Sequence, residues 1–153
     1  MNPHKDSPHP FRYPDDGLLR VQGVVKEQEI RHPTSLDKNG ESCLIVIKNG
    51  RTTGVTVGRA TSIESFVRRS DYGIRSTSIE IAIHSYDHKS GAFSADGDSG
   101  SIVVDGMGRI IGLITGASGA FDSKDVSYVT PYFWLEERIK KAFPASHLYP
   151  TRE

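Results

Sequence analysis

The sequence predicts an all-β fold, an antiparallel barrel or sandwich that ends in one helix. Three observations predict it. Short apolar segments recur at regular spacing after Ser42, Asn49-Gly50 is a strong two-residue hairpin signal, and apolar residues recur at helical spacing near the C-terminus. Regularly spaced strands without helices between them favour an antiparallel sheet over βαβ units.

The chain before Ser42 is predicted to lie outside the sheet. Four of the eight prolines fall at positions 3, 8, 10 and 14 with little apolar material beside them, so residues 1–16 are expected to be a disordered tail. Residues 17–41 are expected to be a linker or a remnant strand, because the short apolar run from Leu18 to Val25 is followed by turn residues.

The strand signals follow between residues 42 and 131. Leu44–Ile47 precedes the hairpin signal, and residues 53–59 alternate as the returning strand. Ile79, Ile81 and Ile83 keep the period of two of a half-buried strand. The remaining strand signals are Val103-Val104, Ile110–Ile114 and Val126–Pro131.

A helix at about 132–142 closes the predicted domain, and residues 146–153 are expected to be a second tail. The residues expected to seat one helix face against the sheet recur at helical spacing. They are Trp134, Leu135, Ile139 and Phe143.

The segment Gly97-Asp98-Ser99-Gly100 carries the chemistry. Glycines let the backbone turn tightly and point N–H groups into a concavity, where they could hold a developing oxyanion beside the serine. A β-turn that only joins two strands would have the same composition. Asp98 is expected to orient this turn through local backbone hydrogen bonds.

Gly97–Ser101, followed by a valine strand and by Gly112–Gly116, resembles the nucleophile region of trypsin-like (chymotrypsin-fold) serine proteases. Lys48–Gly58 resembles the first hairpin of the C-terminal barrel in disulfide-poor branches of that family. Val126–Pro131 and the segment after it resemble the last strand and the closing helix. The resemblance runs collinearly over about residues 20–150 and extends to fungal S1-type peptidase domains. It implies a six-stranded antiparallel β-barrel with a C-terminal helix over residues 42–145, one half of the double-barrel fold.

The resemblance also implies roles for single residues. Ser99 would be the nucleophile, and the N–H groups of Gly97 and Ser99 would form the oxyanion hole. Thr115, Gly116 and Ala117 would be the strand edge that pairs with an extended substrate. Phe93 stands where trypsins keep the acid that selects basic substrates; a core phenylalanine is the alternative interpretation.

The general base has no clear candidate. A serine hydroxyl needs an adjacent base, which in this family comes with its aspartate from an N-terminal barrel. The sequence shows no such barrel before Ser42. His84 and His88 precede Ser99 most closely, and a strand-end and loop position is the expectation for both. Two functions therefore stay open: a serine endopeptidase domain that lacks its His/Asp half, or a non-catalytic module that binds peptides or proteins.

Composition excludes several classes of partner. Lys+Arg and Asp+Glu both number 19, and no run of eighteen apolar residues exists, so neither nucleic acid nor a membrane is an expected partner. The expected partners are a peptide or protein substrate and an upstream barrel or second copy that covers the exposed barrel face. The polar N-terminus and the single Cys43 favour a cytoplasmic protein. No metal site or cofactor is predicted. Arg68, Arg69 and Arg75 are expected in a solvated loop.

Overall fold

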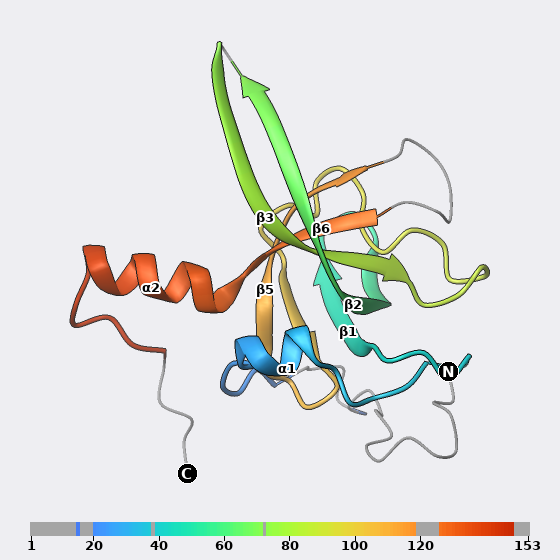
Figure 1. The fold of residues 1–153 in the computed structure, drawn as a ribbon. Coiled ribbons are helices and arrows are strands. Elements are labelled where there is room, and N and C mark those ends of the chain that lie inside the picture. Colours follow the sequence, from blue (N-terminus) through green and yellow to red (C-terminus); the bar gives the residue numbers. More distant parts are fainter. Residues whose placement is uncertain (1–14, 16–19, 38, 72, 119–125, 149–153) are drawn as a thin grey trace.

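Six antiparallel strands close into a barrel in the spatial order β1-β2-β3-β6-β5-β4 (Figure 1). The computed structural model describes residues 15, 20–37, 39–71, 73–118 and 126–148. The predicted six-stranded antiparallel barrel followed by one helix is confirmed. The strands are β1 (Leu44–Gly50), β2 (Gly54–Asp71), β3 (Ile74–Ser85), β4 (Ile102–Asp105), β5 (Ile110–Ser118) and β6 (Val126–Pro131).

The first hairpin turns later than its sequence signal predicted. Asn49 still pairs with Val55, and Gly50 pairs with Gly54, so the turn itself consists of residues 51–53. Gly54 ends this turn with a φ of 62°, a conformation that favours glycine. The hairpin was therefore predicted correctly, but its turn begins two positions later than predicted, after Gly50.

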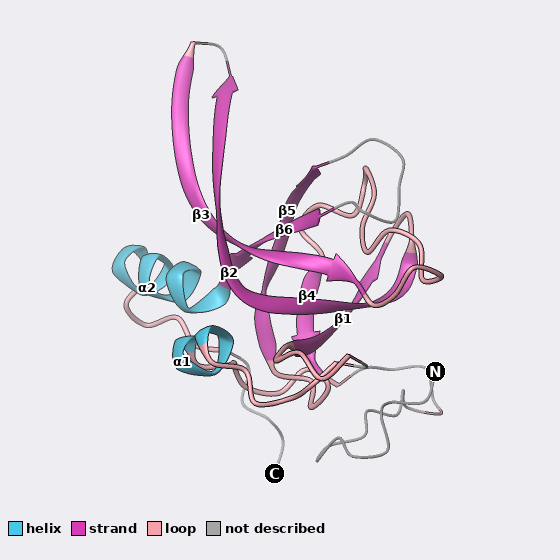
Figure 2. Ribbon diagram, turned by 45° about the vertical axis from the view of Figure 1, so that its right-hand side comes forward, coloured by secondary structure: helices cyan, strands magenta, loops and turns pink. Residues whose placement is uncertain are grey.

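A two-stranded arm, residues 64–79, extends β2 and β3 beyond the barrel (Figures 1 and 2). β1 pairs with β2 only as far as Ala60, and β6 pairs with β3 only from Ile81 onward. A register shift between Ala60 and Glu64 marks the place where the arm leaves the barrel wall. The solvated loop expected around the arginines is wrong. No described residue between 65 and 79 belongs to the core cluster, so burial did not impose the apolar alternation that would have signalled strands here.

The segment before β1, expected to be a linker or a remnant strand, packs on the barrel and forms a single β-bridge there, between Val24 and Ile110. Val25 N–H donates to the Ile110 carbonyl at 2.9 Å, and Ile110 N–H donates to the Gly23 carbonyl at 3.0 Å. A short helix that the sequence analysis did not anticipate, α1 (Glu27–Arg31), places the buried Ile30 in the core cluster. The chain from residue 20 onward is therefore part of the barrel domain.

The core lies inside the barrel and is almost entirely aliphatic, with Val46, Ile83, Val103, Ile111 and Val129 fully buried. Helix α2 (Tyr132–Ala142) packs outside the barrel against β5 and β6 (Figure 2). The expected apolar face is wrong in detail, because Trp134, Ile139 and Phe143 stay exposed and Phe133 contacts the core instead. Neither described helix is long and apolar enough to cross a membrane.

Candidate functional site

Ser99 is exposed in a turn that connects the buried Asp98 to β4. Gly97 and Gly100 flank it with φ values of 96° and 85°, which an L side chain adopts only with strain. A Cβ at Gly97 would also lie 2.6 Å from the Thr52 hydroxyl oxygen. Two separate features therefore require glycine at position 97: the positive φ of its backbone and the close approach of Thr52 from the first hairpin.

Three backbone hydrogen bonds hold the turn, and two of its N–H groups have no acceptor among the described residues. Asp98 N–H donates to the Ala95 carbonyl at 3.0 Å, Gly100 N–H to Ile114 at 2.8 Å, and Ser101 N–H to Asp98 at 3.0 Å. The N–H groups of Gly97 and Ser99 donate to no described residue. Two nearby amides on a fixed turn, next to an exposed hydroxyl, form an arrangement that can bind an oxyanion.

The Asp98 carboxylate is the buried anchor of this turn. Its side chain is 0% exposed and accepts hydrogen bonds from Thr52 N–H at 2.7 Å, Ala95 N–H at 3.1 Å and the Thr53 hydroxyl at 2.6 Å. Only the bond from Ala95 is local. Asp98 therefore has the expected kind of local bond, and the first hairpin supplies most of its other donors.

Lys48 supplies the counter-charge. Its ammonium, also 0% exposed, lies 3.2 Å from Asp98 Oδ2 and donates to the Gly54 carbonyl at 2.9 Å and to the Thr53 hydroxyl. Burial alone would raise the pKa of Asp98, but the hydrogen bonds from Thr53, Thr52, Ala95 and Lys48 hold that pKa well below its usual range. The carboxylate is charged at neutral pH and tethers the Ser99 turn to β1.

The edge of β5 beside the turn pairs with β4 only at its beginning. β4 pairs with β5 only as far as Leu113, and after Ile114 the strand pairs with β6 alone among the described strands. Thr115, Gly116 and Ala117 lie on this stretch. Because Gly100 N–H donates to the Ile114 carbonyl, the open edge begins next to the Ser99 turn. An extended peptide could add there as a further strand.

Phe93 lies in the core and not on a substrate surface. Its side chain is 1% exposed and belongs to the core cluster, and its carbonyl accepts a hydrogen bond from the Thr56 hydroxyl at 2.7 Å. The alternative interpretation, a core phenylalanine, therefore describes its position. We assign Phe93 a packing role.

The histidines do not complete a catalytic pair within the described chain. His84 is half-buried at the end of β3 opposite Arg59, and His88 is exposed in the following loop. Burial, and secondly the Arg59 charge, lower the pKa of His84. No hydrogen bond joins the Ser99 hydroxyl to a histidine that the structure describes. In the same residues no cluster of three His, Cys, Asp or Glu side chains could hold a metal ion.

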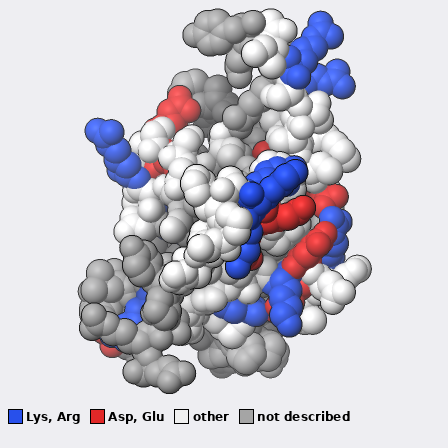
Figure 3. All heavy atoms as spheres, turned by 90° about the vertical axis from the view of Figure 1, so that its left-hand side faces the viewer, with Lys and Arg blue, Asp and Glu red and all other residues white. Residues whose placement is uncertain are grey.

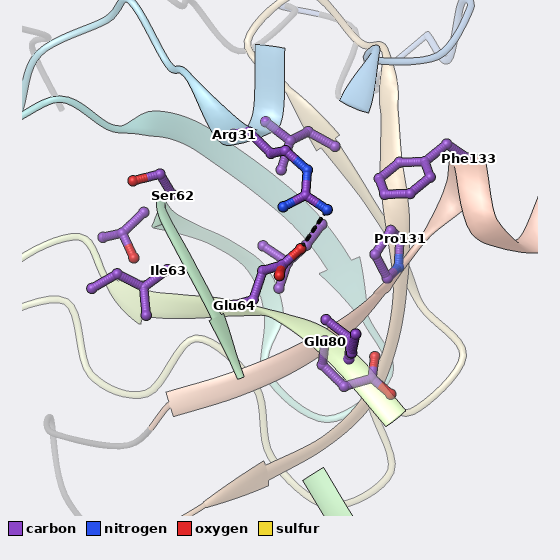
Figure 4. Close-up of a pocket in the computed structure, with 11 residues that line it drawn as sticks. Arg31, Ser62, Ile63, Glu64, Glu80, Pro131 and Phe133 are labelled. Carbon is purple, nitrogen blue, oxygen red and sulfur yellow. Dashed lines mark ion pairs between the residues drawn. The ribbon is translucent and has the colours of Figure 1, made fainter. Parts of the chain in front are cut away.

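A pocket elsewhere on the molecule lies at the base of the arm (Figure 4). Its wall is mainly apolar, and an ion pair of 2.8 Å between Arg31 and Glu64 crosses it. Glu80 beside it is buried and accepts a hydrogen bond from the Thr130 hydroxyl at 2.7 Å. The Ser99 turn does not line this pocket, so the two features are separate.

Comparison with known proteins gives little beyond the fold. No family model matches this sequence, and no curated protein does either. The structure is similar to the crystal structure of Cellulomonas bogoriensis chymotrypsin, at 22% sequence identity and a TM-score of 0.45. The match covers 66% of this chain and 47% of that chymotrypsin, so the chain spans about half of its length.

Proposed function

We propose that this barrel is the nucleophile-bearing half of a trypsin-like serine endopeptidase. Ser99 Oγ attacks the carbonyl carbon of a peptide bond, and the N–H groups of Gly97 and Ser99 stabilise the oxyanion that forms. The observation that carries the proposal is the Asp98-anchored turn, which exposes the serine and leaves these two amides without a described acceptor. The resemblance of the Gly97–Ser101 region to that family supports it independently.

The proposed substrate is an extended peptide or protein segment. It would pair along β5 at Thr115, Gly116 and Ala117, on the side of the strand away from β6, where main-chain hydrogen bonds would fix the direction of the substrate. Because this edge begins at Ile114, whose carbonyl is bonded to the turn, a peptide on β5 would run directly past Ser99.

The reaction needs a base from outside the described barrel. When Ser99 Oγ bonds to the carbonyl carbon, its proton must pass to an acceptor, which then protonates the leaving amine; water completes the hydrolysis of the acyl-enzyme. We propose that a His/Asp pair on a further barrel supplies this acceptor. The 153-residue chain alone is then expected to show no ordinary peptidase turnover, because the oxyanion hole alone contributes only roughly a thousandfold over water.

A non-catalytic role is the second candidate, and the absence of a hydrogen bond between Ser99 and a described histidine favours it. The anchored turn and the open β5 edge would persist in a pseudo-protease that binds peptides without cleaving them. Peptide binding that depends on residues 115–117 but not on Ser99, with no acylation under any condition, would identify this function.

The test is covalent labelling of Ser99 by a fluorophosphonate probe. We expect labelling when a His/Asp-bearing barrel is supplied as a separate chain or in a longer product of the gene. We expect none in Ser99→Ala, with turnover falling on the order of a millionfold. The exposed Ser76→Ala is the matched control and should label normally. Equal labelling of the wild type and Ser99→Ala would show that another residue reacts.

The chain alone provides the complementary assay. We expect no casein hydrolysis by the wild type, His84→Ala, His88→Ala or Ser99→Ala. Robust turnover that is lost both in Ser99→Ala and in one histidine variant would contradict the proposed external base and reveal a self-contained dyad.

A further inference from the structure

The arm presents an uncovered sheet with apolar side chains on it. Phe66 is 74% exposed and stands opposite Ile79, which is 48% exposed, while Ile74 near the tip is 73% exposed. These exposures are high for large apolar residues in a strand. Long strands with unpaired edges and exposed apolar side chains pair readily with another chain, and proteins normally cover or charge such edges.

Within the arm, the outer edge of β2 is available for pairing with another strand. From Glu64 to Asp71 this strand pairs only with β3, because β1 stops at Ala60. Its residues alternate between the two faces, so Glu64, Phe66 and Arg68 share one face. Glu64 pairs with Arg31 at the base of the arm, whereas Arg68 forms no ion pair with a described residue. On this face, the strand therefore carries an acidic residue, Glu64, next to the barrel and a basic residue, Arg68, farther out, without an ion-pair partner among the described residues.

Figure 3 shows the same charge distribution on the surface. At the top of this view, where the arm ends, the charged side chains that the structure describes are all basic. Acidic and basic side chains are mixed lower down. The acids near the arm's base include Glu64 and Glu27, both within an ion-paired group with Arg31. Two arms laid antiparallel would bring the basic end of each arm against Glu64, an acidic member of this mixed group, on the other.

We propose that the β2 edge of the arm pairs antiparallel with the same edge of a second copy of this chain. Centred on Phe66, this pairing places Glu64 of each copy opposite Arg68 of the other and the two Phe66 rings opposite each other. Ile79 extends the apolar row on both outer sides, because it pairs with Phe66 within each arm. The interface has two-fold symmetry, as a self-complementary strand requires.

The β3 edge offers no equivalent match. Between Ile74 and Ile79 it carries Arg75 but no acidic residue, and Glu80 at its base is buried and bonded to Thr130. A β3 edge paired with itself would leave both Arg75 side chains without a counter-charge. Charge complementarity therefore selects the β2 edge.

The test is the oligomeric state of the whole 153-residue chain, measured by sedimentation velocity over a range of concentrations. We expect a dimer whose dissociation constant rises with salt. Arg68→Glu places two like-charged pairs across the symmetric interface at once, and we expect roughly a tenfold or larger rise in the dissociation constant. The double variant Glu64→Arg with Arg68→Glu restores opposite charges and should restore the dimer.

Arg75→Glu is the matched control, since it makes the same charge change on the same arm but away from the proposed edge, and it should leave the dissociation constant unchanged. Circular dichroism of each variant establishes that the barrel is folded. A wild-type monomer at every concentration would overturn the proposal. Equal weakening by Arg68→Glu and Arg75→Glu would overturn it too, as would failure of the double variant to recover association while it remains folded.

Discussion

Replacing Lys48 by methionine tests whether a buried ion pair holds the Ser99 turn. The variant keeps most of the side-chain volume but removes the ammonium, so the charged Asp98 carboxylate and the Gly54 carbonyl both lose a buried donor. Breaking a buried ion pair by removing one partner typically destabilises a protein by about 3–5 kcal/mol. Asp98 keeps its bonds from Thr52, Thr53 and Ala95. We therefore expect a loss at the lower end, about 3 kcal/mol.

The measurement is urea unfolding at pH 7 followed by circular dichroism, with the free energy of unfolding taken from the linear extrapolation. Lys89→Met, an exposed lysine, is the control and should change this free energy by less than about 0.5 kcal/mol. The double variant Lys48→Met with Asp98→Asn should be more stable than the sum of the two single losses predicts, by about 1–3 kcal/mol, because the two side chains interact directly.

The same variant predicts a pH dependence. The depressed pKa of Asp98 contributes stability that is present above its unfolded value of about 3.9 and is lost as the pH falls through the folded value. Without Lys48 this pKa rises, so Asp98 becomes protonated at a higher pH and no longer needs a counter-charge. The stability difference between the wild type and Lys48→Met should narrow as the pH falls through the higher pKa that Asp98 has in the variant. A difference below about 1 kcal/mol at pH 7, or one that widens on acidification, would refute this reasoning.

Three further predictions concern packing and burial. Gly58→Ala would place a Cβ 2.7 Å from the Phe93 ring and 2.8 Å from the His84 carbonyl oxygen, so we expect a loss of about 1–3 kcal/mol or more in urea unfolding. Gly54→Ala meets no neighbour but has a φ of 62°, so it should lose only about 1–2 kcal/mol; a larger loss there than at Gly58 would contradict the packing. Burial raises the pKa of the Cys43 thiol to about 11, so iodoacetamide at pH 8 should alkylate it only after unfolding in urea; rapid alkylation of the native protein would contradict its burial.

The barrel could be predicted because its strands carry their own signals. The continuous apolar run Ile110–Ile114 lies in β5, and the alternating Ile79, Ile81 and Ile83 lie in β3. Ile81 and Ile83 line the core, whereas Ile79 at the start of the arm is exposed. The arm could not be predicted in the same way. Its residues from Ser65 to Ser70 pair with a neighbouring strand but cover no core, so burial imposes no period of two on them.

The exposed turn of the candidate site could be predicted from the sequence, whereas the buried Lys48–Asp98 ion pair beneath it could not. Gly97, Ser99 and Gly100 form the turn that their residue types indicate, since only glycine adopts these φ values without strain. Lys48 gives no comparable signal. It follows Val46 and Ile47 in β1 and ends the apolar run, which normally marks a residue that returns to solvent, yet all three side chains are buried. Only the position of Asp98 in three dimensions explains a buried lysine there.

The first hairpin therefore constrains the Ser99 turn in a way that neither segment reveals alone. Lys48, Thr52 and Thr53 contribute the charge and the donors that hold Asp98, while Gly50 leaves the space for it. A Cβ at Gly50 would overlap the Asp98 carboxylate and lie 3.0 Å from the Lys48 ammonium. The buried ion pair between Lys48 and Asp98 joins the hairpin to a turn fifty residues later in the chain. Substitutions in the hairpin should consequently alter the conformation of the Ser99 turn.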